Sequence, residues 1–224
     1  MTIDVFQVLS SFIVLLLSLS VHESAHAWTA NKLGDPTARV LGRISLNPFV
    51  HAEFFGTFLF PLIGFFSGFI FGWAKPVPVD LNRLRNPKRD YMLVAAAGPG
   101  SNLMMATFLF LFMMILKSSS SSMELLVSQV ARGMTVGEPL LEAMVSMAYF
   151  GLMINLILAV FNLIPVAPLD GAAVLSGFLP DSVSDLYAQI QNYGFFILIG
   201  LLFLGVPSYL FRPLIGTVNS FFVY

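Results

Sequence analysis

Residues 5–28, VFQVLSSFIVLLLSLSVHESAHAW, decide the fold class of this 224-residue chain. The run is longer than the roughly 20 apolar residues that a helix needs to cross the hydrocarbon core of a bilayer. It is too long for the core of a signal peptide, and no small-residue cleavage site follows it. We therefore expect a first membrane helix that the mature protein retains.

The composition extends this expectation to the whole chain. Charged residues make up only 10% of the sequence and hydrophobic residues 57%, with a mean hydropathy of +0.85. Soluble domains carry about 25% charged residues, so a soluble enzyme is excluded. A net charge of −1 provides no basic field for nucleic acid, which is not an expected partner. With no Cys and three His, a metal would have to be held by imidazoles and carboxylates.

Further apolar runs follow at residues 54–73, 91–116, 139–163 and 187–204, and the tail 209–224 is long enough for another short helix. The pattern predicts an all-α polytopic membrane protein with five to six membrane helices. No repeat or composition break divides the chain, so residues 1–224 are expected to form one domain. The stretch 39–47, RVLGRISLN, alternates and contains β-branched residues, which favours a short β-hairpin after the first helix.

The basic residues predict the orientation. Eight of the eleven lie in two loops: Lys32, Arg39 and Arg43, then Lys75, Arg83, Arg85, Lys88 and Arg89. Short loops rich in Lys and Arg are cytoplasmic, yet the run 54–73 separates these two. That run is therefore predicted to enter the membrane and return on the same side, with Pro61 and several glycines at its turn. An ordinary tilted span that packs through Gly64, Gly68 and Gly72 stays open as the alternative.

With that orientation, the loop 117–137 is external, and its Ser118–Ser122 tract is interpreted as a flexible linker.

The first run ends in His22-Glu23-Ser24-Ala25-His26. Residues four apart share a helix face, so both imidazoles can bind one metal ion while Glu23 serves as general base toward a water molecule. Polar side chains that reach toward the membrane surface are the alternative explanation.

Catalytic zinc usually has three protein ligands, and the candidates for the third are His51 and the few acids near the membrane. Asp170 is the strongest, because it follows the fourth span on the same predicted side, after two helix-breaking prolines and before Gly171. An exposed helix-cap Asp is the competing interpretation.

Three stretches together suggest a family: the His22–His26 motif, residues 97–102 (AGPGSN) and residues 162–171 (NLIPVAPLDG). In these, the chain resembles the site-2 proteases, M50-type intramembrane zinc metalloproteases. It looks most like the short prokaryotic branch that lacks a PDZ or CBS domain. The resemblance implies that His22, His26 and Asp170 bind one Zn²⁺ ion, that Glu23 is the catalytic base, and that Asn162 holds substrate or the oxyanion.

The short branch also tends to carry Leu-Asn-Pro-x-x-His, found here at residues 46–51. The resemblance suggests a supporting or substrate-positioning role for His51, although Glu53-Phe54 replaces the usual Asp-Pro that follows. An interfacial His without a role is equally open. Gly98 and Pro99 are interpreted as serving close helix packing and a helix start.

The predicted function is hydrolysis of peptide bonds in transmembrane protein substrates, near the cytoplasmic face of a prokaryotic inner (plasma) membrane. The lipid bilayer is the other expected partner, and the sequence leaves the oligomeric state undetermined. An inactive relative that binds membrane segments is one alternative, and a metal or ion transporter is another. Residues 143–163 contain no acid and no inverted repeat is visible, which argues against a transporter.

Overall fold

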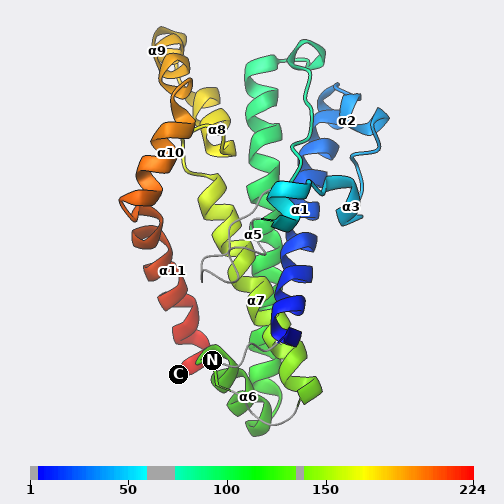
Figure 1. The fold of residues 1–224 in the computed structure, drawn as a ribbon, viewed down its shortest axis with the longest axis vertical. Coiled ribbons are helices and arrows are strands. Elements are labelled where there is room, and N and C mark those ends of the chain that lie inside the picture. The colour runs from blue at the N-terminus through cyan, green and yellow to red at the C-terminus, as the bar shows by residue number, and fades with distance from the viewer. Residues whose placement is uncertain (1–4, 60–73, 135–138) are drawn as a thin grey trace.

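The computed structural model describes residues 5–59, 74–134 and 139–224, and within these ranges every regular element is helical. The core is a bundle of α1 (Val5–Leu33), α5 (Pro87–Ser119) and α7 (Pro139–Asn162), which lie side by side in Figure 1. Each of the three is long and apolar enough to cross a membrane. The all-α expectation is confirmed, and three of the predicted spans are present as candidate membrane helices.

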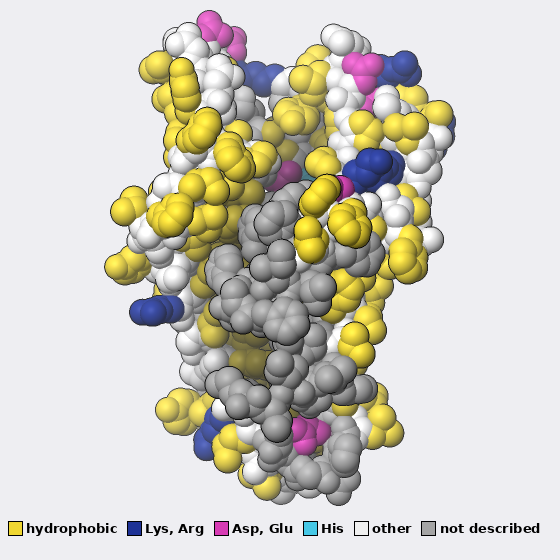
Figure 2. Space-filling model, viewed as in Figure 1, with side chains coloured by type: hydrophobic (Ala, Val, Ile, Leu, Met, Phe, Trp, Pro, Cys, Tyr) yellow, Lys and Arg dark blue, Asp and Glu magenta, His cyan; other side chains and the backbone are white. Residues whose placement is uncertain are grey.

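Small side chains let α1 and α5 approach closely. Ala27 and Ala30 on α1 are fully buried, and Gly98 on α5 lies directly against the His22 and His26 side chains of α1. Small residues at such contacts bring backbones together and gain dispersion contacts, which lipid cannot replace. Figure 2 shows hydrophobic side chains along the flanks of the molecule, whereas most charged side chains on this face gather toward its two ends.

The rest of the described chain adds fewer spans than predicted. Four helices follow α7: α8 (Asp170–Phe178), α9 (Asp181–Gln191), α10 (Gly194–Phe203) and α11 (Val206–Val223). The predicted span 187–204 is broken, because α9 and α10 meet at an angle of 67°. The described residues therefore hold three spans, or four if this bent pair is one. The count of five to six is not confirmed, although the predicted helix in the tail is present as α11.

The β-hairpin prediction for residues 39–47 was wrong. Asp35 accepts hydrogen bonds from the backbone N–H and the hydroxyl of Thr37, and this starts the short helix α2 (Thr37–Val40). The chain then turns at Gly42, whose φ is +69°, and the Arg43 N–H donates to the carbonyl of Ala38. These local bonds leave no strand pair, and α3 (Pro48–His51) follows.

The re-entrant segment was predicted for residues 54–73, and most of it lies outside the described residues. Its first part, Phe54–Leu59, is a π-helix. After the gap, residues 74–80 have no regular secondary structure and lead through the 3₁₀ turn η2 (Leu81–Arg83) into α5. Whether the segment crosses the membrane or returns stays a prediction.

Two local interpretations are corrected. Pro99 does not start a helix, since α5 begins at Pro87 and Pro99 lies within it. The serine tract is not simply a linker, because α5 extends through it to Ser119. The Ser120 hydroxyl then accepts from the N–H of Met123 and caps α6 (Ser121–Ala131).

Candidate metal centre

Two helices bring the predicted metal ligands together. His22 and His26 lie on one face of α1 and are 5% and 7% exposed. Asp170, the first residue of α8, meets both. Its Oδ2 atom lies 3.1 Å from Nε2 of His22 and 3.4 Å from Nε2 of His26, and the two Nε2 atoms are 3.0 Å apart.

The tautomer of His26 follows from its neighbour on α5. Its Nδ1 atom lies 2.7 Å from the backbone carbonyl of Val94. A carbonyl oxygen only accepts hydrogen bonds, so Nδ1 must carry the proton. In a neutral ring, Nε2 then presents a lone pair toward Asp170.

A longer chain of hydrogen bonds fixes the tautomer of His22. On α7, the Asn155 amide nitrogen donates to the carbonyl of Gly151, so its Oδ1 faces Asn102. Asn102 donates to that oxygen over 2.7 Å and turns its own Oδ1 to Nδ1 of His22, 2.6 Å away. His22 therefore donates from Nδ1 and also presents a lone pair at Nε2. Both asparagines are fully buried.

Three electron-pair donors thus converge with no proton between them when both rings are neutral. Such an arrangement is repulsive unless a cation lies among the three atoms. Four ligands at 2.0–2.1 Å around zinc would be separated from one another by about 3.3 Å, and the observed separations are 3.0–3.4 Å. Asp170 Oδ2 is also buried without a hydrogen-bond donor. The residues present therefore fit a zinc ion.

The charge state of Asp170 suits a metal ligand. Burial raises the pKa of this carboxyl, but without a metal, hydrogen bonds and positive charge from protonated His22 and His26 rings outweigh burial and lower it to about 2. The group is consequently a carboxylate at neutral pH. Gly171 permits its placement, because a Cβ atom there would lie 2.3 Å from the carbonyl oxygen of Leu163.

Gly98 on α5 closes the other side of the cluster. A Cβ atom at this position would lie 2.3 Å from Nε2 of His26 and 2.6 Å from Cε1 of His22. The absence of a side chain is what lets α5 pack directly against both imidazoles. The prediction of close packing at Gly98 is confirmed, and the packing partner is the metal cluster itself.

Glu23 lies next to His22 on α1 and is partly exposed beside the irregular segment 74–80. Its carboxylate accepts a hydrogen bond from the backbone N–H of Val77 over 3.1 Å. The contact orients the carboxylate and leaves further lone pairs free to accept a proton.

Neither Asn162 nor His51 joins the cluster. The Asn162 amide donates to the carbonyl of Leu158 on its own helix. His51 is 2% exposed, and its Nε2 lies 2.8 Å from the carbonyl of Ser45 and 3.3 Å from the hydroxyl of Ser24. In the described part of the chain, the group able to hold a metal consists of His22, His26 and Asp170 alone.

Sequence reasoning missed Asn155. The signal was present, since an amide within an apolar membrane helix is costly and marks a functional position. The sequence argument for residues 143–163 concerned acids, and Asn155, about two turns before the motif that begins at Asn162, had no evident partner. Asn102 was noted as part of a motif but not as the partner of His22.

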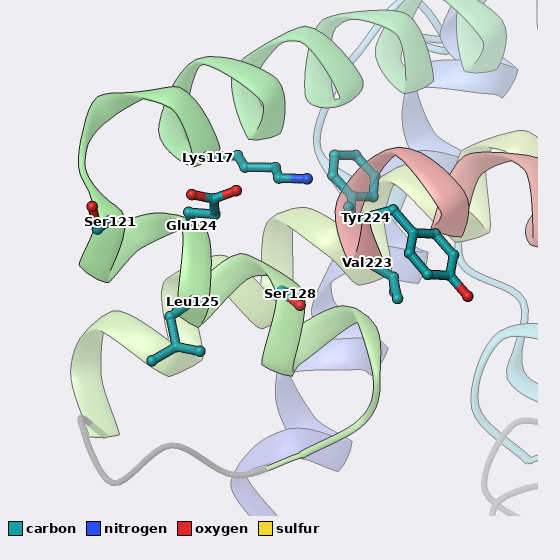
Figure 3. Close-up of a pocket in the computed structure, with 8 residues that line it drawn as sticks. Lys117, Ser121, Glu124, Leu125, Ser128, Val223 and Tyr224 are labelled. Atoms are coloured by element: carbon teal, nitrogen blue, oxygen red, sulfur yellow. The ribbon is translucent and has the colours of Figure 1, made fainter.

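A separate cavity of about 370 Å³ lies at the end of the bundle where α6 and the last turn of α11 meet (Figures 1 and 3). Lys117, Ser121, Glu124 and Tyr224 are among its lining residues. None of the predicted site residues lines it.

Two comparisons with known proteins found a match. The model of the family described as Peptidase family M50 matches residues 10–205, a range that includes all three candidate ligands. The Bacillus subtilis (strain 168) protein named "Putative zinc metalloprotease YwhC" is 36% identical over 204 residues, which cover 91% of this chain and 84% of that protein. No solved structure matches the chain.

Proposed function

The chain belongs to peptidase family M50, the site-2 protease family, and on that premise we propose that it is an intramembrane zinc endopeptidase acting on transmembrane proteins. One observation carries the proposal. Nε2 of His22, Nε2 of His26 and Oδ2 of Asp170 converge within 3.4 Å, with both imidazole protons committed elsewhere.

The proposed chemistry needs a Lewis acid, a base and an oxyanion donor. Zinc, when bound, polarises the scissile carbonyl and lowers the pKa of a coordinated water toward neutrality. Glu23 accepts the proton of the attacking water and passes it to the leaving amine. The Val77 N–H fixes one lone pair of Glu23 and so aims the carboxylate.

Asn162 is proposed to bind substrate or the oxyanion, a contact worth about 3 kcal/mol in known hydrolases. Its amide must first leave the carbonyl of Leu158, so we expect substrate binding to turn this side chain.

His51 is proposed to position Glu23 rather than to bind metal. Its ring contacts Ser24 on the motif helix, and its carbonyl accepts from the N–H of Lys75 over 2.8 Å. Lys75 begins the short stretch that reaches Glu23 through Val77.

The basic loops favour a site that opens toward the cytoplasm in a prokaryotic plasma membrane. The substrate must be partly unwound, because helical hydrogen bonds shield the scissile carbonyl. We therefore expect a transmembrane segment with helix-breaking residues.

The test combines metal analysis with cleavage of a model transmembrane substrate in detergent. The Glu23→Gln variant should keep one zinc per chain and lose cleavage by orders of magnitude. His22→Ala should lose both. Undiminished cleavage by Glu23→Gln would refute the assignment, and zinc binding without cleavage by the unaltered protein would favour an inactive relative.

A further inference from the structure

The backbone of the segment that carries Asp170 is held by its own chain only through short-range hydrogen bonds. Residues 163–169 (LIPVAPL) connect α7 to α8, and Pro165 and Pro168 have no N–H to donate. Val166 and Leu169 donate locally, to the carbonyls of Ile164 and Val166. Something else must hold this segment if the Asp170 carboxylate is to stay in place.

Two side chains of α9 supply that support, one helical turn apart. The Gln191 amide oxygen accepts from the N–H of Ala167 over 2.6 Å, and its amide nitrogen lies 3.3 Å from the carbonyl of Pro165. The amide thus pairs with the segment as a neighbouring peptide group would.

Tyr187 extends the same contact to α8. Its hydroxyl lies 3.1 Å from the Pro165 carbonyl and 3.2 Å from the carbonyl of Ala172, two residues beyond Asp170. A single hydroxyl therefore bridges the segment and the first turn of the helix that presents the ligand.

Packing reinforces the hydrogen bonds. A Cβ atom at Gly194, the first residue of α10, would lie 2.5 Å from the carbonyl oxygen of Ala167. The backbone at the junction of α9 and α10 therefore packs directly against Ala167, in the middle of residues 163–169.

We propose that Tyr187 and Gln191 are positioning residues, which fix the Asp170 carboxylate at the metal by holding the backbone of residues 163–169. The inference rests on the proposed function for the identity of the metal ligand. Neither side chain touches the cluster, so the effect is transmitted through the backbone. Ligand distances in a zinc site tolerate about 0.2 Å, which makes metal binding sensitive to small shifts of this segment.

The experiment replaces each side chain and measures metal binding directly. Gln191→Ala and Tyr187→Phe are expected to weaken zinc binding about 10-fold to 100-fold in a chelator competition, the usual loss when a supporting partner of a ligand is removed. They should also alter the visible absorption of the Co²⁺-loaded protein, which reports coordination geometry. Gln191→Glu keeps the acceptor for the Ala167 N–H and should recover most of the affinity.

Gln189→Ala is the matched control, because Gln189 is exposed on the same helix. A zinc affinity and Co²⁺ spectrum of Gln191→Ala equal to those of the control would overturn the proposal. If Gln191→Ala fails to fold, Tyr187→Phe decides, since it removes one oxygen atom and keeps the ring. Failure of the unaltered, zinc-loaded protein to cleave would overturn the proposed function alone.

Discussion

Gly98→Ala is the sharpest perturbation that the structure offers, since it adds one methyl group beside the metal cluster. The added Cβ atom would lie 2.3 Å from Nε2 and 2.5 Å from Cε1 of His26, and 2.6 Å from Cε1 of His22. Carbon and nitrogen atoms rest about 3.5 Å apart, so a ring or a helix must move by roughly 1 Å.

Hydrogen bonds to α5 restrict any movement of the two imidazole rings. The His26 ring is hydrogen-bonded to the carbonyl of Val94, on the same helix as Gly98. The His22 ring is hydrogen-bonded to Asn102, one helical turn after Gly98. A shift of roughly 1 Å far exceeds the tolerance of about 0.2 Å for zinc ligands. We expect at least a 10-fold to 100-fold loss of zinc affinity, together with about 1–3 kcal/mol of destabilisation from overpacking.

The control is two residues away. A Cβ atom at Gly100, also within α5, would meet nothing within 4 Å, and Ala is the better helix former by about 0.5–1 kcal/mol. Gly100→Ala should therefore bind zinc normally and be as stable as the unaltered protein or slightly more so.

Zinc affinity by chelator competition and thermal unfolding in detergent measure both effects. Equal zinc affinity and equal thermal stability for Gly98→Ala and Gly100→Ala would refute the contact between α5 and the imidazoles.

Asn155→Leu removes the amide that orients Asn102, and zinc affinity should fall about 10-fold to 100-fold; a normal value would disprove the relay to His22. Chelation should remove about 2.7 kcal/mol of stability from protein held with zinc at 100 times its Kd, and so lower its unfolding temperature, but should not affect His22→Ala. Burial raises the pKa of Asp35, but hydrogen bonds from Thr37 and the Asp80 N–H lower it further, so its stabilisation is present above about pH 4 and disappears as pH falls through the folded pKa. Acid unfolding of Asp35→Asn should lack this component; an identical pH profile would contradict it.

Much of the site was predictable because its chemistry is local in sequence. His22 and His26 are four residues apart on a helix, so their shared face follows from helix geometry. Asp170 was reached through its predicted side of the membrane and the resemblance, and the structure brings it within 3.4 Å of both imidazoles. Asn162 and His51 were named as well, yet their side chains bond elsewhere, because rotamers depend on neighbours that sequence spacing does not reveal.

The sequence of residues 5–28 was enough to predict a membrane helix, because the length of an apolar run is a property of a single segment. It was also enough to predict a metal-binding motif, because the helical period places His22 and His26 on one face. Only the tertiary structure decided which nitrogen of each imidazole is turned toward Asp170. That choice depends on the Val94 carbonyl and on the Asn102–Asn155 pair, which lie 68 to 133 residues from the imidazoles along the chain and become their neighbours only when α1, α5 and α7 pack. The tertiary structure also decided that Tyr187 and Gln191 of α9 hold residues 163–169, because hydrogen bonds between separate segments leave no periodic pattern in a sequence.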